Sequence, residues 1–122
     1  MTRDKSDYLF AMVEPMSRLG TLQFETQTLK DRGKLAEAAA GFTEMETLLR
    51  ELIRLHEQHN ADHPSSPMDI PPLVSSLANT LMMHADVLDA MGDDGEALRM
   101  AAIEASSNTS PAEAANRRRD RA

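Results

Sequence analysis

The sequence predicts an all-α protein built from two antiparallel helical hairpins, with four main helices. Three observations lead to this prediction. Apolar residues recur at steps of three or four through most of the 122 residues, as they do on one face of an α-helix. No segment alternates apolar with polar residues, so no strand is expected. The third observation is a residue pattern that occurs twice, once around Gly33 and once around Gly92.

The doubled pattern extends to both sides of each glycine. A glutamate and an alanine follow it, and two leucines and one small residue precede it at equal distances. These residues are Leu22, Thr26, Leu29, Glu37 and Ala38 in the first copy and Leu81, Ala85, Leu88, Glu96 and Ala97 in the second. Glycine ends helices readily because it adopts the left-handed conformation without a steric cost. Each copy therefore predicts a tight turn between two antiparallel helices.

The first hairpin is expected over residues 15–60, with a short amphipathic segment over 4–13 before it. Pro15 leaves two arrangements open, because proline is disfavoured inside a helix but accepted in its first turn. Either a short helix ends at Val13 and another begins at Pro15, or one long helix kinks there. The helix after Gly33 has the clearest apolar stripe in the chain and is expected from about residue 36 to 60. At about 1.5 Å per residue it is long enough to need a second packing partner.

A linker over residues 61–72 separates the hairpins, because four of the chain's six prolines fall there. The second hairpin is expected over 73–106, with a helix that ends at Gly92 and another from about Asp94 to Ala105. Both hairpins are assigned to a single helical domain, 1–116. Ser110 and Glu113 have the spacing of a capping box and predict the start of a short fifth helix. Residues 117–122 form a basic tail.

The doubled pattern resembles the tetratricopeptide repeat, a helix-turn-helix unit of about 34 residues. The resemblance covers about residues 19–45 and 78–105. It implies that small residues meet where the two helices of each unit cross, Thr26 with Ala38 and Ala85 with Ala97. An ordinary four-helix up-and-down bundle is the alternative arrangement of the same helices.

In the tetratricopeptide family, the concave face formed by the first helices of the units binds peptides or partner helices. The resemblance therefore implies a groove over residues 16–30 and 73–91. The binding residues proposed for it are Leu22, Glu25, Leu29, Leu81, His84 and Leu88. Because two such units leave their end faces uncovered, we also expect the chain to associate with itself, most simply as a two-fold dimer.

Charge and cysteine content limit the function classes. The net charge is −7, and the last six residues carry +3, which leaves −10 on the first 116. Such an acidic body repels nucleic acid. The absence of cysteine excludes disulfides and cysteine-based metal or redox sites. No secretory signal and no apolar run of membrane-spanning length is found, so a cytoplasmic location without a membrane partner is expected.

Histidines provide the only sharp chemical lead. His56, His59 and His63 would share one helical face and could hold a metal ion if the helix reached His63. Pro64 disfavours helix at that position, so a polar helix end is the expectation that we prefer. His84 lies on an apolar face and is expected to be a core or groove-edge residue with satisfied hydrogen bonds rather than a catalytic one.

Two further clusters have structural explanations that we prefer to functional ones. The methionines Met82, Met83, Met91 and Met100 are expected in the core, although methionine-rich surfaces can also bind partner helices. The acidic residues Asp86, Asp89, Asp93, Asp94 and Glu96 are expected to form a solvated corner, which could attract a cation or a basic peptide.

No catalytic constellation and no phosphate-binding loop is present in the sequence. We therefore expect no cofactor and no enzymatic activity. The function predicted is a protein-protein interaction or scaffold module that binds a peptide or partner helix in a helical groove. The alternative is a helical bundle that binds a small ligand or a metal ion through its histidines.

Overall fold

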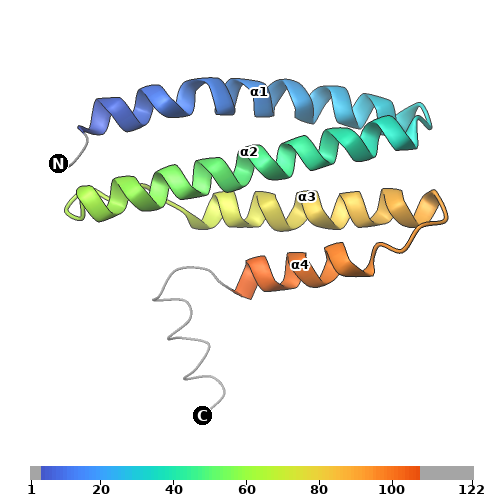
Figure 1. Cartoon of the computed structure of the whole chain (residues 1–122). Coiled ribbons are helices and arrows are strands. Elements are labelled where there is room, and N and C mark those ends of the chain that lie inside the picture. Colours follow the sequence, from blue (N-terminus) through green and yellow to red (C-terminus); the bar gives the residue numbers. More distant parts are fainter. Residues whose placement is uncertain (1–3, 108–122) are drawn as a thin grey trace, which may run out of the picture.

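The computed structural model of the chain describes residues 4–107. Its helices are α1 (Lys5–Asp31), α2 (Leu35–Asp62), α3 (Pro71–Ala90) and α4 (Glu96–Ser107). Figure 1 shows them as two antiparallel hairpins that follow one another along the chain. The predicted all-α fold is confirmed, and the described residues contain no strand. The predicted fifth helix near Ser110 and the basic tail at 117–122 lie outside these residues.

Both glycines end a helix, as the sequence predicts. Gly33 has a φ of 76° and Gly92 a φ of 85°, in the left-handed region that favours glycine. At each turn, the N–H of the residue after the glycine donates to a leucine carbonyl. Lys34 donates to Leu29 at 2.9 Å, and Asp93 donates to Leu88 at 2.8 Å. The N–H of Gly33 donates to the Lys30 carbonyl and that of Gly92 to the Asp89 carbonyl, both at 3.0 Å. The two hinges are therefore the same Schellman motif.

The helix before the first hinge continues through Pro15. α1 extends over Lys5–Asp31. Of the two arrangements considered for Pro15, a break between two helices or a single long helix, the structure has the single helix. Proline has no N–H, so the carbonyl of Ala11 loses its usual intrahelical donor. Packing on both sides of Pro15 offsets this loss, because α1 buries side chains before and after the proline. These are Tyr8, Met12, Leu19, Leu22 and Thr26.

The connection between the hairpins is shorter than the predicted 61–72, because α2 continues to Asp62 and α3 begins at Pro71. The side chain of Asn60 fixes this connection. Its Nδ2 donates to the Met68 carbonyl at 2.9 Å, and its Oδ1 accepts the Met68 N–H at 2.7 Å. Two prolines fill the first turn of α3, where a missing N–H costs little.

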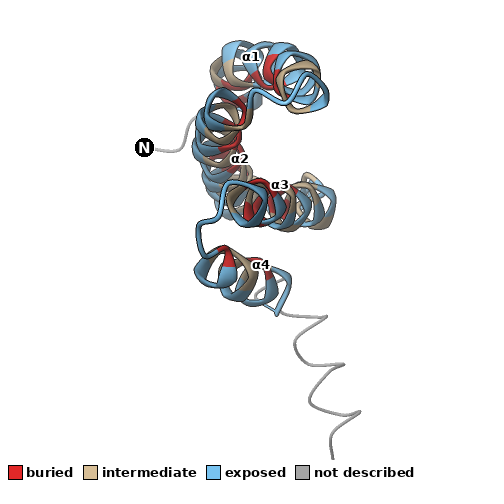
Figure 2. Cartoon of the chain, turned by 90° about the vertical axis from the view of Figure 1, so that its right-hand side faces the viewer, coloured by how far each residue is buried: buried red, intermediate tan, exposed pale blue. Residues whose placement is uncertain are grey.

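The helices pack consecutively, each against the next one in the chain. Figure 2 shows α1 and α4 at opposite ends, with α2 and α3 between them. A closed four-helix bundle would bring the first and last helices together, so the arrangement is an open array. α2 is packed by α1 on one side and by α3 on the other, which confirms that this long helix has a second partner.

Glycines allow two close approaches within the hairpins. A Cβ placed on Gly41 of α2 would lie 2.3 Å from Oγ1 of Thr26 on α1. A Cβ placed on Gly95, just before α4, would lie 2.5 Å from the carbonyl oxygen of Ala85 on α3. Both distances are below van der Waals contact. The two segments of each hairpin therefore approach each other closely at a position where only glycine fits.

The small-residue contacts implied by the repeat are not the same in the two hairpins. Ala38 is fully buried in the first, but its counterpart Ala97 is exposed in the second. The first turn comprises residues 32–34, whereas the second comprises 91–95. The longer turn places Gly95 opposite Ala85, so the expectation for Ala97 is wrong.

Candidate functional site

A groove with a volume of about 330 Å³ lies between α1 and α3, over α2. In Figure 2, α1 and α3 lie on the same side of α2, and the residues that line the groove come from these three helices. Phe42 and Met45 of α2 lie at its floor, where both are buried, at 2% and 3% exposure. The walls are mainly amides and hydroxyls. They are formed by Gln23 and Gln27 of α1 and by Ser76, Asn79, Thr80 and Met83 of α3.

Helix geometry brings these wall residues together. Gln23 and Gln27 are one turn apart on α1, and the four residues of α3 recur at steps of three, one and three, so each set shares one helix face. The hydroxyl of Thr80 donates to the Ser76 carbonyl at 2.8 Å, and Nε2 of Gln27 donates to Asp31 Oδ1 at 2.9 Å. Gln23 and Asn79 are exposed. Each amide offers both donors and acceptors to a ligand.

The six residues proposed for the groove lie beside it rather than in it. Leu22 and Leu81 are buried in the core, at 5% and 0% exposure. Leu29 and Leu88 are half-buried, and Glu25 is exposed. Regularly spaced leucines form the faces on which helices pack, so the repeat positions indicate the core. The spacing of the two glutamines and of the Ser76–Met83 face was the signal for the groove itself.

His84, the sixth of these residues, is half-buried and stacks on the groove residue Phe42. The ring centroids are 6.1 Å apart, with 24° between the planes. Its Nδ1 is buried without a hydrogen-bond partner. Burial lowers the pKa of His84 from the usual 6.5, and the charge of Glu46 opposes this in part. Burial thus disfavours the charged form of this side chain. The half-buried ring is consistent with the expected groove-edge position, but the expectation that its nitrogens would be hydrogen-bonded is wrong for Nδ1.

The lowered pKa of His84 predicts a pH-dependent stability. In the unfolded chain the imidazole titrates near 6.5, so below that pH the unfolded state binds more protons than the folded state. Stability is therefore lost as the pH falls from 6.5 through the lower pKa of the folded state. His84→Leu should flatten the dependence of the unfolding free energy on pH between about 7.5 and 5.5, as measured by urea titrations. His56→Gln is the control, and an unchanged slope in His84→Leu would contradict the prediction.

The histidines proposed as metal ligands take part in separate local contacts. His56 donates from Nδ1 to the Leu52 carbonyl at 2.8 Å. His59 is fully buried, with its ring centroid 5.5 Å from that of Tyr8 and 5.2 Å from that of His63. Between residues 4 and 107, no three His, Cys, Asp or Glu side chains are arranged to hold a metal ion. The structure thus brings His59 and His63 together in an aromatic cluster, without a third metal ligand.

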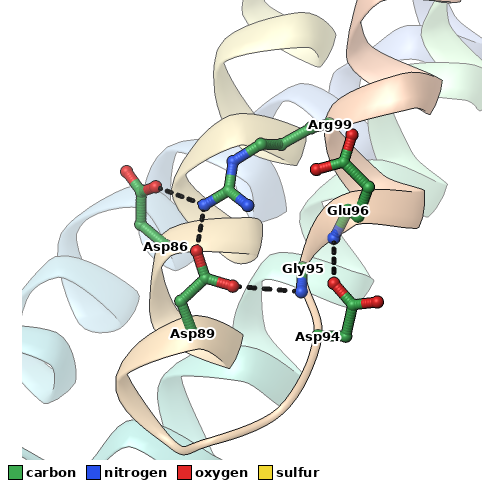
Figure 3. A network of polar contacts seen from close by, with 6 residues as sticks. All are labelled: Asp86, Asp89, Asp94, Gly95, Glu96 and Arg99. Atoms are coloured by element: carbon green, nitrogen blue, oxygen red, sulfur yellow. Dashed lines mark hydrogen bonds and ion pairs between the residues drawn. The ribbon is translucent and has the colours of Figure 1, made fainter.

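The acidic corner is partly neutralised by an arginine that sequence analysis missed. Figure 3 shows Arg99 of α4 reaching across to α3, where its Nη2 pairs with Asp86 at 3.2 Å and also with Asp89. Asp89 in addition accepts the Gly95 N–H at 3.1 Å. The hydrogen bond from Arg99 lowers the pKa of Asp89. These contacts stabilise the packing of α4 on α3. Arg99 and its partners are too far apart in the sequence for their pairing to be visible there.

The methionines are mostly not in the core, contrary to the expectation from the sequence. Met82 is 40% exposed, Met91 39% and Met100 57%. Met83 is half-buried and lines the groove. Methionine is flexible and polarisable, so Met83 can adapt its shape to a bound side chain.

Two findings complete the description of the chain. The described helices include none that is long and apolar enough to cross a membrane. Comparison with protein-family models, curated proteins and solved structures finds no match.

Proposed function

We propose that the chain is an interaction module, not an enzyme, and that it binds an extended peptide segment of a partner protein in the groove between α1 and α3. The observation that carries this proposal is a groove with walls of amides and hydroxyls over a floor formed by the core side chains of Phe42 and Met45. An extended peptide presents unpaired backbone N–H and C=O groups along its length. Exposed amides such as those of Gln23 and Asn79 can bond both kinds of group.

The size of the groove favours a peptide over a whole helix. Its volume of about 330 Å³ is near the lower end of the range for binding pockets, roughly 300–1,000 Å³. A helix with its side chains is about 10 Å wide and would need a longer and broader surface. A few residues of extended chain, with one side chain directed towards Met83, fit this space.

Charge favours a basic peptide. The chain has a net charge of −7, and a field of one sign raises the association rate of ligands of the opposite sign. Binding should therefore weaken as the salt concentration rises, because salt screens charges that are more than about 8–10 Å apart.

A selection from a displayed library of short peptides tests the proposal. Selection on the intact chain should enrich peptides with lysine or arginine, and their affinity can be measured by fluorescence polarisation. Asn79→Trp places a bulky ring in the groove and should weaken binding by at least about tenfold. Ser75→Trp is the matched control, since Ser75 is exposed on α3 but does not line the groove.

The outcome is decided by the two tryptophan variants. Loss of affinity in Asn79→Trp with unchanged affinity in Ser75→Trp supports a peptide site in the groove. No enrichment, or selected peptides that bind both variants as tightly as the unchanged chain, would rule this site out. Affinity that is lost equally in both variants would do the same.

A further inference from the structure

α1 has a second apolar face whose large side chains are mostly exposed in the described part of the chain. Large apolar side chains on this helix are more than half exposed: Leu9 54%, Phe10 83%, Val13 63%, Met16 58% and Phe24 76%. Residues 9, 13, 16, 20 and 24 are spaced by three or four, so they share one side of the helix. We call this set, with Phe10 beside it, the outer face of α1. It differs from the face that α1 buries against α2.

The position of α1 explains why this face is uncovered. α1 is the first helix of the array and lies at one end of it (Figures 1 and 2), with its extensive packing confined to α2. The outer face nevertheless exposes five large apolar side chains. Five side chains of this size and exposure present on the order of 500 Å² of surface, an area at which exposed apolar patches mark interaction sites.

We infer that the outer face of α1 pairs with the same face of a second copy of the chain, in an antiparallel arrangement about a two-fold axis near Met16. The face is self-complementary in this arrangement. Leu9 lies opposite the partner's Phe24, and Val13 lies opposite the partner's Gly20. Each of these contacts occurs twice, as two-fold symmetry requires.

Gly20 makes the pairing sterically suitable. A Cβ placed on it would meet nothing within 4 Å, so this glycine leaves an open position in the middle of the outer face. A branched side chain from the other copy, that of Val13, fills a position of this kind when two helices approach closely. Two copies would cover roughly 1,000 Å² with these side chains alone, which is the minimum expected for a specific interface.

Other occupants of the outer face fit less well. Residues 108–122 contain no Leu, Ile, Val, Met or Phe, so this segment of the chain has little apolar surface to offer. A membrane surface favours helices whose polar side is basic. The polar side of α1 instead carries Asp7, Glu14 and Glu25, and its Arg18 is paired with Glu44 at 2.8 Å. A second copy supplies a matching apolar face.

Sedimentation equilibrium of the full chain tests the pairing. The unchanged chain should be a dimer at tens of micromolar. Val13→Glu and Gly20→Arg should each weaken dimerisation at least about tenfold, because each places an unpaired charge in an apolar contact. Both replacements are good helix formers, and circular dichroism checks that the variants remain folded.

The combined variant tests the antiparallel register. With both changes in one chain, each new carboxylate meets a new guanidinium of the other copy, so dimerisation should recover to within about threefold of the unchanged chain. Ile103→Glu is the matched control, because Ile103 is equally exposed, at 59%, but lies on α4. A monomeric unchanged chain, a combined variant as weak as either single change, or equal disruption by Ile103→Glu would each overturn the inference.

Discussion

Gly95→Ala is expected to destabilise the protein by about 3 kcal/mol, the upper end of the usual cost of overpacking. The new Cβ would lie 2.5 Å from the carbonyl oxygen of Ala85 and 2.9 Å from its Cα. Both are backbone atoms of α3, so no side-chain rotation can relieve the contact. α4 would have to move away from α3, which would also weaken the pairing of Arg99 with Asp86 and Asp89. Urea denaturation followed by circular dichroism measures the loss.

Gly92→Ala is the matched control for this prediction. It lies in the same turn, and its Cβ would meet nothing within 4 Å. Its cost comes only from the positive φ of 85°, about 1–2 kcal/mol for a residue with a Cβ. If Gly95→Ala is no more destabilising than Gly92→Ala, the close approach of α3 and α4 at Gly95 is contradicted.

The second large effect is expected at the crossing of α1 and α2. Gly41→Ala would place a Cβ 2.3 Å from Oγ1 of Thr26 and 3.1 Å from its Cγ2. Alanine is favoured over glycine inside a helix by about 1 kcal/mol, but a contact this short outweighs that gain. We expect a net loss of about 2 kcal/mol in the free energy of unfolding.

Thr26→Ala should rescue much of this loss. Oγ1 of Thr26 is buried without a hydrogen-bond partner, so its removal deletes an unsatisfied polar atom as well as the clash. A double-mutant cycle should therefore show a favourable coupling of at least about 1 kcal/mol between the two changes. Strictly additive effects would show that Gly41 and Thr26 do not determine how closely α1 and α2 approach.

The turns were predictable from the sequence because their cause is local. Gly33 and Gly92 each adopt a positive φ at the end of a helix, and each is preceded by a leucine whose carbonyl accepts the closing hydrogen bond. The residues before the glycines are correspondingly buried alike in both hairpins: Leu22 and Leu81 in the core, Thr26 and Ala85 at 1% and 0% exposure.

The residues after the glycines were predicted less well, because their positions depend on the length of the turn. Glu37-Ala38 and Glu96-Ala97 look equivalent in sequence, but the second turn includes two more residues before its helix begins. A shift of two residues rotates a helix by more than half a turn. This rotation exposes Ala97 and brings Gly95 into the contact with Ala85.

The groove could be located from the sequence only approximately. Its two walls belong to the predicted ranges 16–30 and 73–91, but most of the residues that form these walls are polar. Apolar periodicity identifies the faces that helices bury against each other, and it therefore selected core residues such as Leu22 and Leu81. Gln23 directly follows the repeated Leu22, and Asn79 lies two residues before the repeated Leu81, so both read as the polar neighbours of core positions. Their approach depends on the tertiary packing of α1 and α3 on α2.

The open array is the claim on which the groove and the outer face of α1 both depend, and a spin-label distance between α1 and α4 tests it most directly. The chain has no cysteine, so labels can be attached to cysteines introduced at the exposed positions Thr21 and Met100. Neighbouring helices lie about 8–10 Å apart, so three such steps set an upper limit of roughly 24–30 Å, and because the array is curved we expect a separation below this limit but clearly above about 15 Å. A separation of about 10–15 Å, as in a closed four-helix bundle, would contradict the account.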